Sequence, residues 1–129
     1  MFYVFTHTMI ATDLVAAPAR IEMPLTVGVI HQVDVLFETG CNNDACVQIF
    51  RGGQQLWPSN RGAYMVGNAT IVSFREFEEL KAGANDLYAL IWGAVALVGP
   101  QVSIQIGILP KTILQPMSFN ALLAAATGM

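Results

Sequence analysis

The sequence predicts an all-β fold: a single-domain antiparallel β-sandwich of the jelly-roll type with seven or eight strands. Two observations support this prediction. Apolar and polar residues alternate along several short segments, and turn-forming Gly, Pro and Asn residues separate these segments. A chain of 129 residues is the size of one domain. We expect the sandwich to cover residues 1–110 and an apolar C-terminal arm or short helix to follow at 111–129.

The alternation is clearest in the segment that ends at Gly40. One face of the predicted strand carries Val29, His31, Val33, Val35 and Phe37, and the other carries Gln32 and Asp34. Ile21, Met23 and Leu25 alternate in the same way before it. Residues 71–77 predict a further strand, distorted where the apolar spacing changes at Phe74, Phe77 and Leu80.

A hairpin is predicted over residues 47–57, with Gly52 and Gly53 as its two-residue loop. Paired glycines supply the positive φ angles that tight hairpin turns need. In the expected register Ile49 faces Leu56 and Arg51 faces Gln54, while Phe50 lies beside Gln55. Trp57 then falls on the opposite face from Ile49. Residues 61–68 contain two glycines and read as a loop.

The last third of the chain has almost no charge, since residues 87–129 contain a single charged residue, Lys111. Residues 87–109 are long enough to span a membrane as a helix. However, the turn-forming pair Gly99-Pro100 interrupts them, and residues 102–108 then alternate with the period of a strand. We therefore expect two core strands that meet at Gly99-Pro100, and no membrane partner.

The overall composition favours a permanent assembly. Hydrophobic residues make up 54% of the chain and charged residues 12%, about half the roughly 25% that is typical of soluble domains. A chain of this size cannot easily hide so much apolar surface alone. The net charge of −3 and the scattered basic residues give no electrostatic footprint for nucleic acid.

The residues after Pro110 read as an arm. Pro110 and Pro116 keep the segment extended, and Ser118 can cap a short helical run. Such a helix is too short to be stable alone in water. Its apolar residues Phe119, Leu122 and Leu123 are therefore candidate contacts to the same chain, a sister subunit or a larger partner, and a frayed terminus is the alternative.

The chemically reactive side chains form no recognisable catalytic or metal motif. Cys41 and Cys46 lack the further ligands that zinc needs. The two cysteines can form a disulfide or remain as reduced thiols packed in the core, and the sequence does not choose between these alternatives. His7 and His31 have no nucleophile beside them in a known motif, so we expect structural histidines. Glu76, Glu78 and Glu79 are expected to form a solvated strand edge that discourages aggregation. We expect no catalytic residue, metal or cofactor.

Three aromatic residues could form a carbohydrate-binding platform: Trp57, Tyr64 and Trp92. Core packing is the simpler explanation for Trp92, which lies in a charge-free strand. Trp57 and Tyr64 remain candidate interface residues, because Trp57 is expected on the outer face of the hairpin, beside the turn at Pro58.

Four runs resemble small uncharacterised proteins from the structural gene clusters of tailed phages and prophages. They are residues 28–37, residues 47–60 (with the segment RGGQQLWPSN), residues 73–77 and residues 106–110. The resemblance covers roughly residues 3–110 and contains no motif with a known catalytic role. It implies a β-sandwich of the decoration, adaptor or fibre-associated kind. Residues 111–129 are less typical of the group.

We therefore expect a virion structural protein, made in the host cytoplasm, that decorates and stabilises a phage capsid. Its expected partners are itself, as a homo-oligomer with a trimer favoured, and the major capsid protein or another virion protein. A tail or head-to-tail connector subunit is the alternative in the same class. A carbohydrate-binding module for host adsorption is the alternative in another class.

Overall fold

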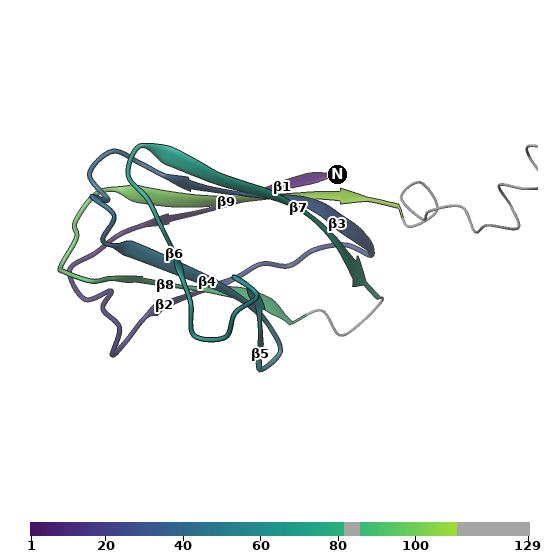
Figure 1. The fold of residues 1–129 in the computed structure, drawn as a ribbon, viewed down its shortest axis with the longest axis horizontal. Helices are drawn as coiled ribbons and strands as arrows, with labels where there is room; N and C mark the ends of the chain where they lie inside the picture. Colours follow the sequence, from purple (N-terminus) through teal and green to yellow (C-terminus); the bar gives the residue numbers. More distant parts are fainter. Residues whose placement is uncertain (82–85, 111–129) are drawn as a thin grey trace, which may run out of the picture.

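The computed structural model describes residues 1–81 and 86–110, which form two antiparallel sheets packed face to face (Figure 1). The four-stranded sheet has the order β1 (Phe2–Thr8), β9 (Gln101–Leu109), β3 (Gly28–Phe37), β7 (Thr70–Leu80). The five-stranded sheet has the order β2 (Ala19–Glu22), β8 (Leu87–Gly93), β4 (Ala45–Arg51), β5 (Gln54–Trp57), and β6 (Met65–Val66) also pairs with β4. The predicted all-β sandwich is confirmed.

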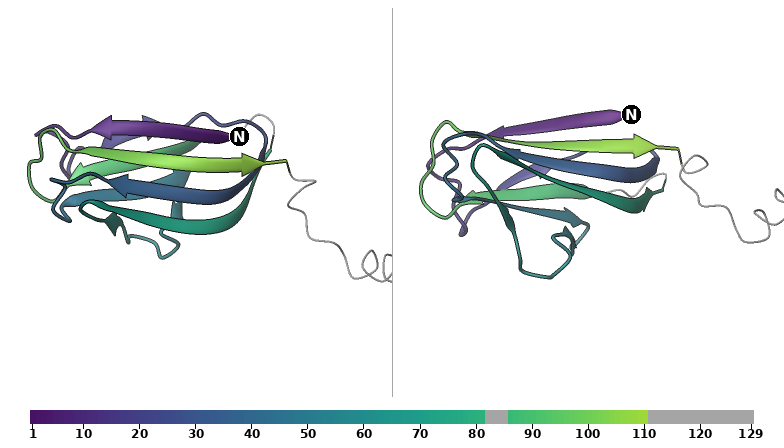
Figure 2. Two further views of the ribbon diagram at one scale, coloured as in Figure 1. Left: turned by 90° about the horizontal axis from the view of Figure 1, so that it is seen from above. Right: turned by 45° about the horizontal axis from the view of Figure 1, so that its top comes forward.

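Early strands pair with late strands in a nested order. β1 pairs with β9, β2 with β8, β3 with β7, and β4 with β5, each pair antiparallel. The pairs β3 with β9 and β4 with β8 then join the nested pairs into sheets. As a result β9 and β3 lie inside one sheet, and β1 and β7 form its two borders (Figure 2, left).

The core lies between the two sheets and is built from alternate residues of each strand. Central examples are Val33, Val35 and Phe37 of β3, Val47 and Ile49 of β4, Leu87, Ala89 and Ile91 of β8, and Val102, Ile104, Ile106 and Ile108 of β9. Burying one such aliphatic side chain contributes about 1.5–3 kcal/mol. The alternation that predicted the strands is therefore the pattern that fills the core.

Residues 87–109 form two strands, as expected, and these strands belong to different sheets. β8 lies in the five-stranded sheet and β9 in the four-stranded sheet, and residues 94–100 connect them across one end of the sandwich. Within residues 1–81 and 86–110 no helix is long and apolar enough to cross a membrane. The low charge of β8 and β9 follows from their central positions in the two sheets.

The predicted face of His31 is wrong, because β3 contains an irregularity at this residue. Ile30 pairs with Ile108 of β9 and Gln32 pairs with the next residue, Gly107, so His31 is left out of the register. Ile30 therefore faces the core, and His31 lies on the outer face of the sheet over Gly107. The same irregularity disturbs β7, where the sequence predicted a distortion.

The hairpin turn is confirmed, but its predicted register fails beyond the turn. Arg51 pairs with Gln54 and Phe50 with Gln55, and Gly52 has the positive φ of 60° that such a turn requires. The register then shifts, so that Ile49 pairs with Trp57 instead of Leu56. This shift carries Trp57 to the core face of the hairpin.

The described residues contain nine strands instead of seven or eight. The difference includes β6, a two-residue strand in the segment that was expected to be a loop. It pairs Met65 with Val47 and Val66 with Cys46. The expected arm at 111–129, with Phe119, Leu122 and Leu123, lies outside the described residues.

Substitution of Gly67 tests the packing where β6 leads into β7. A Cβ atom there would lie 2.6 Å from Cγ2 of Thr70 and 2.7 Å from Cδ2 of the core residue Phe37. We expect Gly67→Ala to lower the free energy of unfolding by about 1–3 kcal/mol, because overpacking forces neighbouring side chains to move. Gly53→Ala is the control, since a Cβ at Gly53 meets nothing within 4 Å. Equal urea unfolding curves for the two variants would contradict this packing.

Candidate functional site

The loops at one end of the sandwich expose aliphatic side chains without charge. Residues 9–18 connect β1 to β2 and residues 94–100 connect β8 to β9, and both loops lie at the left end in Figure 1. Their exposed aliphatic side chains are Ile10, Leu14, Val15, Val95 and Val98. The charged residue of these two loops, Asp13, is itself buried. We call the surface formed by these five side chains the apolar end.

Backbone hydrogen bonds join the two loops of the apolar end. The amide of Gly93 donates to the carbonyl of Asp13 at 2.7 Å, and the amide of Met9 donates to the carbonyl of Pro100 at 2.9 Å. The amide of Gly99 donates back to the carbonyl of Met9 at 3.0 Å. Because these bonds already restrict the two loops, binding of a partner costs less conformational entropy of the loops.

A histidine and a carboxylate fix the base of the first loop. Nε2 of His7 lies 2.8 Å from Oδ2 of Asp13, and the amide of Ile10 donates to the same carboxylate oxygen at 3.0 Å. His7 belongs to β1 and Asp13 to the loop, so the pair ties the loop to the sheet. The structural role expected for His7 is consistent with this geometry.

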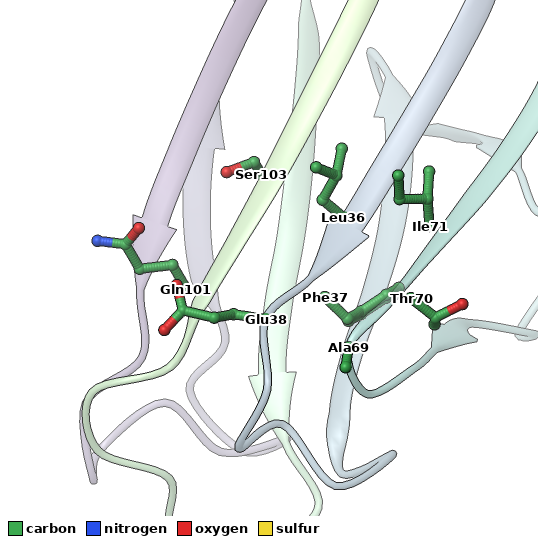
Figure 3. Close-up of a pocket in the computed structure, with 8 residues that line it drawn as sticks. All are labelled: Leu36, Phe37, Glu38, Ala69, Thr70, Ile71, Gln101 and Ser103. Atoms are coloured by element: carbon green, nitrogen blue, oxygen red, sulfur yellow. The ribbon is translucent and has the colours of Figure 1, made fainter.

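An open depression of about 290 Å³ lies on the outer face of the four-stranded sheet, at the same end of the sandwich (Figure 3). It lies where β3 ends and where β7 and β9 begin. The lining residues are Leu36, Phe37, Glu38, Ala69, Thr70, Ile71, Gln101 and Ser103. Its shape and mixed lining suit a side chain of a protein partner better than a tightly enclosed small molecule.

The aromatic residues expected at an interface lie in different environments. Trp57 is 5% exposed and its ring meets Phe74 edge to face, with centroids 5.6 Å apart. Its expected place on an exposed face is therefore wrong. Tyr64 is 52% exposed and packs edge to face on the buried Trp92, with centroids 5.5 Å apart. Tyr64 and Trp57 thus form no common platform.

A polar depression of about 590 Å³ lies beside the hairpin and is lined by Gln48, Phe50, Gly53, Gln54, Gln55, Arg61 and Gly62. Two of its amides already stabilise the loop after β5. Nε2 of Gln55 donates to the carbonyls of Pro58 and Ala63, and Nε2 of Gln48 also donates to the carbonyl of Ala63. The other two polar side chains of this lining, Gln54 and Arg61, are exposed.

The two cysteines are free thiols, and the possible disulfide between them is not formed. Cys41 belongs to the core, and its Sγ donates toward the carbonyl of Gln101. Cys46 pairs with Trp92 in the five-stranded sheet, and its Sγ donates toward the carbonyl of Asp44. Burial raises the pKa of both thiols above the ordinary value, and the negative charge of Asp44 adds to the effect at Cys46.

No group of three or more His, Cys, Asp or Glu side chains within residues 1–81 and 86–110 could hold a metal ion. Of the acidic residues of β7, Glu76 is exposed as expected, but Glu78 and Glu79 are half-buried, so the expected solvated edge is wrong for these two. Oε1 of Glu78 accepts a hydrogen bond from Nη1 of Arg51 at 2.5 Å. These glutamate side chains lie on a border strand of the four-stranded sheet.

Comparison with models of known protein families and with curated proteins found no match to this chain. The candidate site therefore depends on the geometry of the chain itself. Sequence reasoning missed the apolar end, although the signal was present in the runs IATDLVAA and AVALVG. Both runs lack the charged residues that exposed loops usually carry, apart from the buried Asp13.

Removal of the Asp13 carboxylate tests the support of the apolar end. Asp13→Ala leaves the amide of Ile10 and the ring of His7 without this acceptor, and an unsatisfied buried polar group costs about 1–3 kcal/mol. We expect a loss of unfolding free energy of this size in urea titrations. Asp13→Asn keeps an acceptor oxygen and should lose less. Equal losses in the two variants would show that the oxygen is not what stabilises the loop.

The raised thiol pKa values predict slow alkylation and a fall in stability at alkaline pH. The unfolded chain releases the thiol protons at lower pH than the folded chain, so stability falls as pH rises past the unfolded pKa of about 8.5. We expect the urea midpoint to fall between about pH 8 and pH 10, and iodoacetamide to react slowly at pH 8. In Cys41→Ala/Cys46→Ala the fall should be smaller. An identical pH dependence in that variant would contradict the assignment.

Proposed function

We propose that this chain is a virion structural protein that decorates and stabilises a phage capsid, assembled in the host cytoplasm. One observation carries the proposal: the apolar end, which presents aliphatic side chains on loops held in place by hydrogen bonds. Exposed apolar surface of this kind marks protein contacts. The resemblance of residues 3–110 to small proteins of tailed-phage structural gene clusters supports the choice of partner.

The strand order supports assigning the sandwich to the jelly-roll type. A jelly roll consists of two Greek keys and is common in viral capsid domains. The nested pairs, from β1 with β9 to β4 with β5, describe one long antiparallel ribbon folded over itself. Two sheets that share the strands of this ribbon are what the jelly roll requires, with β6 as an addition between β5 and β7.

The proposed mechanism is stabilisation by mass action. A subunit that binds the assembled shell and not its dissociated protein raises the stability of the shell by its binding free energy. The apolar end supplies contact area without a charge to desolvate, and the loop at residues 38–44, with Glu38 and Asn42, adds polar groups nearby. An apolar centre with a polar rim is the usual anatomy of a protein interface.

The arm at residues 111–129 is proposed as a second contact. β9 begins beside the apolar end and finishes at Leu109, at the opposite end of the sandwich (Figure 1). The described part of the chain therefore ends far from the apolar end, and Phe119, Leu122 and Leu123 follow later in the sequence. The apolar end and the arm can contact different neighbouring molecules. A subunit that both forms a homo-oligomer and binds a shell needs two such contacts.

A tail or connector subunit would use the same surfaces on another part of the particle. A carbohydrate-binding module has less support, because Trp57 is buried and the amides of Gln48 and Gln55 are occupied within the chain. The capsid is therefore the preferred partner.

The test is a pair of aspartate substitutions at the apolar end. Val15 and Val98 are 72% and 74% exposed, so Val15→Asp/Val98→Asp should change folding stability little, within about 1 kcal/mol. A buried unpaired charge at the contact should lower occupancy of purified particles at least on the order of tenfold. Occupancy is measured by electron microscopy of native particles, and the heat resistance of the particles is measured in parallel.

Val27→Asp is the matched control, because Val27 is 56% exposed in the connection before β3, away from the apolar end. It should leave occupancy unchanged. Native particles that contain no copy of the chain would refute the proposed function. Normal occupancy of Val15→Asp/Val98→Asp would refute the apolar end as the contact, and deletion of residues 111–129 would then show whether the arm is the contact.

A further inference from the structure

The borders of the two sheets differ in how well they are protected against pairing with other strands. A border strand presents unpaired backbone groups, and proteins usually protect it with charges, proline, irregular register or short length. β7 carries Arg75, Glu76 and Glu78 and has the irregular register opposite His31. β2 has four residues, among them the ion pair of Arg20 with Glu22. β5 has four residues and ends just before Pro58.

β1 has none of these protections. It has seven residues, FYVFTHT, without a formally charged residue at pH 7 or a proline. All seven pair with β9 in one regular register. In the part of the chain that the structure describes, β9 is the strand that pairs with β1, so the other side of β1 is open (Figure 2, left).

The hydrogen bonds at the two ends of β1 show which residues point to the open side. The amide of Ile108 donates to the carbonyl of Met1 at 2.7 Å, and the amide of Met9 donates to the carbonyl of Pro100. In an antiparallel pair, hydrogen-bonded positions alternate with positions that point away. Odd-numbered residues therefore bond to β9. The backbone groups of Phe2, Val4, Thr6 and Thr8 face the open side.

We propose that β1 is the surface through which two copies of this chain associate, by antiparallel pairing of β1 with β1. Under a two-fold axis at Phe5, Phe2 lies opposite Thr8 of the second copy and Val4 lies opposite Thr6 of the second copy. Every outward-facing position then meets another outward-facing position. The match arises because the outward-facing positions are every second residue of β1 and lie symmetrically about Phe5.

Charge and exposure also favour a second copy as the occupant. The acidic residues of the four-stranded sheet lie on β3 and β7, away from the β1 border, so two like-charged copies can approach there without close repulsion. Phe2 and Val4 are 59% and 54% exposed on the outer face. Pairing would cover one side of each, because Thr8 and Thr6 of the second copy would lie beside Phe2 and Val4. The result is one continuous eight-stranded sheet shared by two sandwiches, with an isologous interface.

Pairing through β1 would be the self-association surface of the proposed virion protein. It rests on the proposed function only for its biological purpose, because the test uses the purified full-length chain alone. The wild-type chain should have twice its 13.9 kDa mass by light scattering and sedimentation. Val4→Lys/Thr6→Lys places like charges opposite each other twice. It should raise the dimer dissociation constant by at least the order of tenfold.

Complementary charges test the register itself. Val4→Lys/Thr6→Glu places a lysine opposite a glutamate in both positions and should restore the dimer. A mixture of Val4→Lys/Thr6→Lys with Val4→Glu/Thr6→Glu should form mixed dimers, which docking of residues 111–129 on their own chain would not produce. Ile71→Lys, at a 58% exposed site on the β7 border, is the matched control and should stay dimeric.

Thr6→Pro provides a second variant that introduces no charge. It removes an N–H that points to the open side, so it costs no backbone hydrogen bond to β9, yet it blocks strand addition. It also removes the exposed hydroxyl bond between Thr6 and Ser103 of β9, a loss that the variants with Lys or Glu at position 6 share. Far-UV circular dichroism confirms that each variant is folded. A monomeric wild type, a trimer insensitive to these substitutions, or a dimer unchanged in Thr6→Pro and in Val4→Lys/Thr6→Lys would overturn the inference.

Discussion

The burial of one face of each sheet against the other is the interaction on which the rest of this structure depends. Ile104 and Ile106 of β9 and Val33 of β3 fill one side of the core, and residues such as Val47 of β4 and Ile91 of β8 fill the other. Because successive side chains of a strand point to opposite faces, this burial fixes the register of every central strand. The positions of the strand ends then determine where the loops lie, and the strand order determines which strands form the borders of each sheet.

The nested pairing explains why distant parts of the sequence cooperate at the apolar end. The loops at residues 9–18 and 94–100 are far apart in the chain, but each follows one member of the pairs formed by β1 with β9 and β2 with β8. Both loops must therefore turn at the same end of the sandwich. The bonds of Met9 with Pro100 and of Gly99 with Met9 join the two loops, and the pair of His7 with Asp13 ties the first loop to β1.

The proposed function and the β1 inference assign different surfaces to different partners. The apolar end lies where strands turn, and β1 lies along the side of the four-stranded sheet. Aliphatic side chains contribute area at the first surface, whereas backbone hydrogen bonds contribute directional pairing at the second. A subunit with one surface of each kind can pair with a copy of itself and still offer its end to a shell.

The sequence by itself determined most of the strands, though not β6, because alternation with a period of two is a local property that burial of one face enforces. The alternation and the turn-forming pair Gly99-Pro100 identified the two strands in residues 87–109, and the paired glycines identified the turn at Gly52-Gly53. Only the tertiary structure decided the faces of His31 and Trp57, since each depends on one residue that falls out of register with a neighbouring strand. Tertiary pairing likewise decided which loops meet and which border stays open, because contacts between distant segments leave no periodic signal in the sequence.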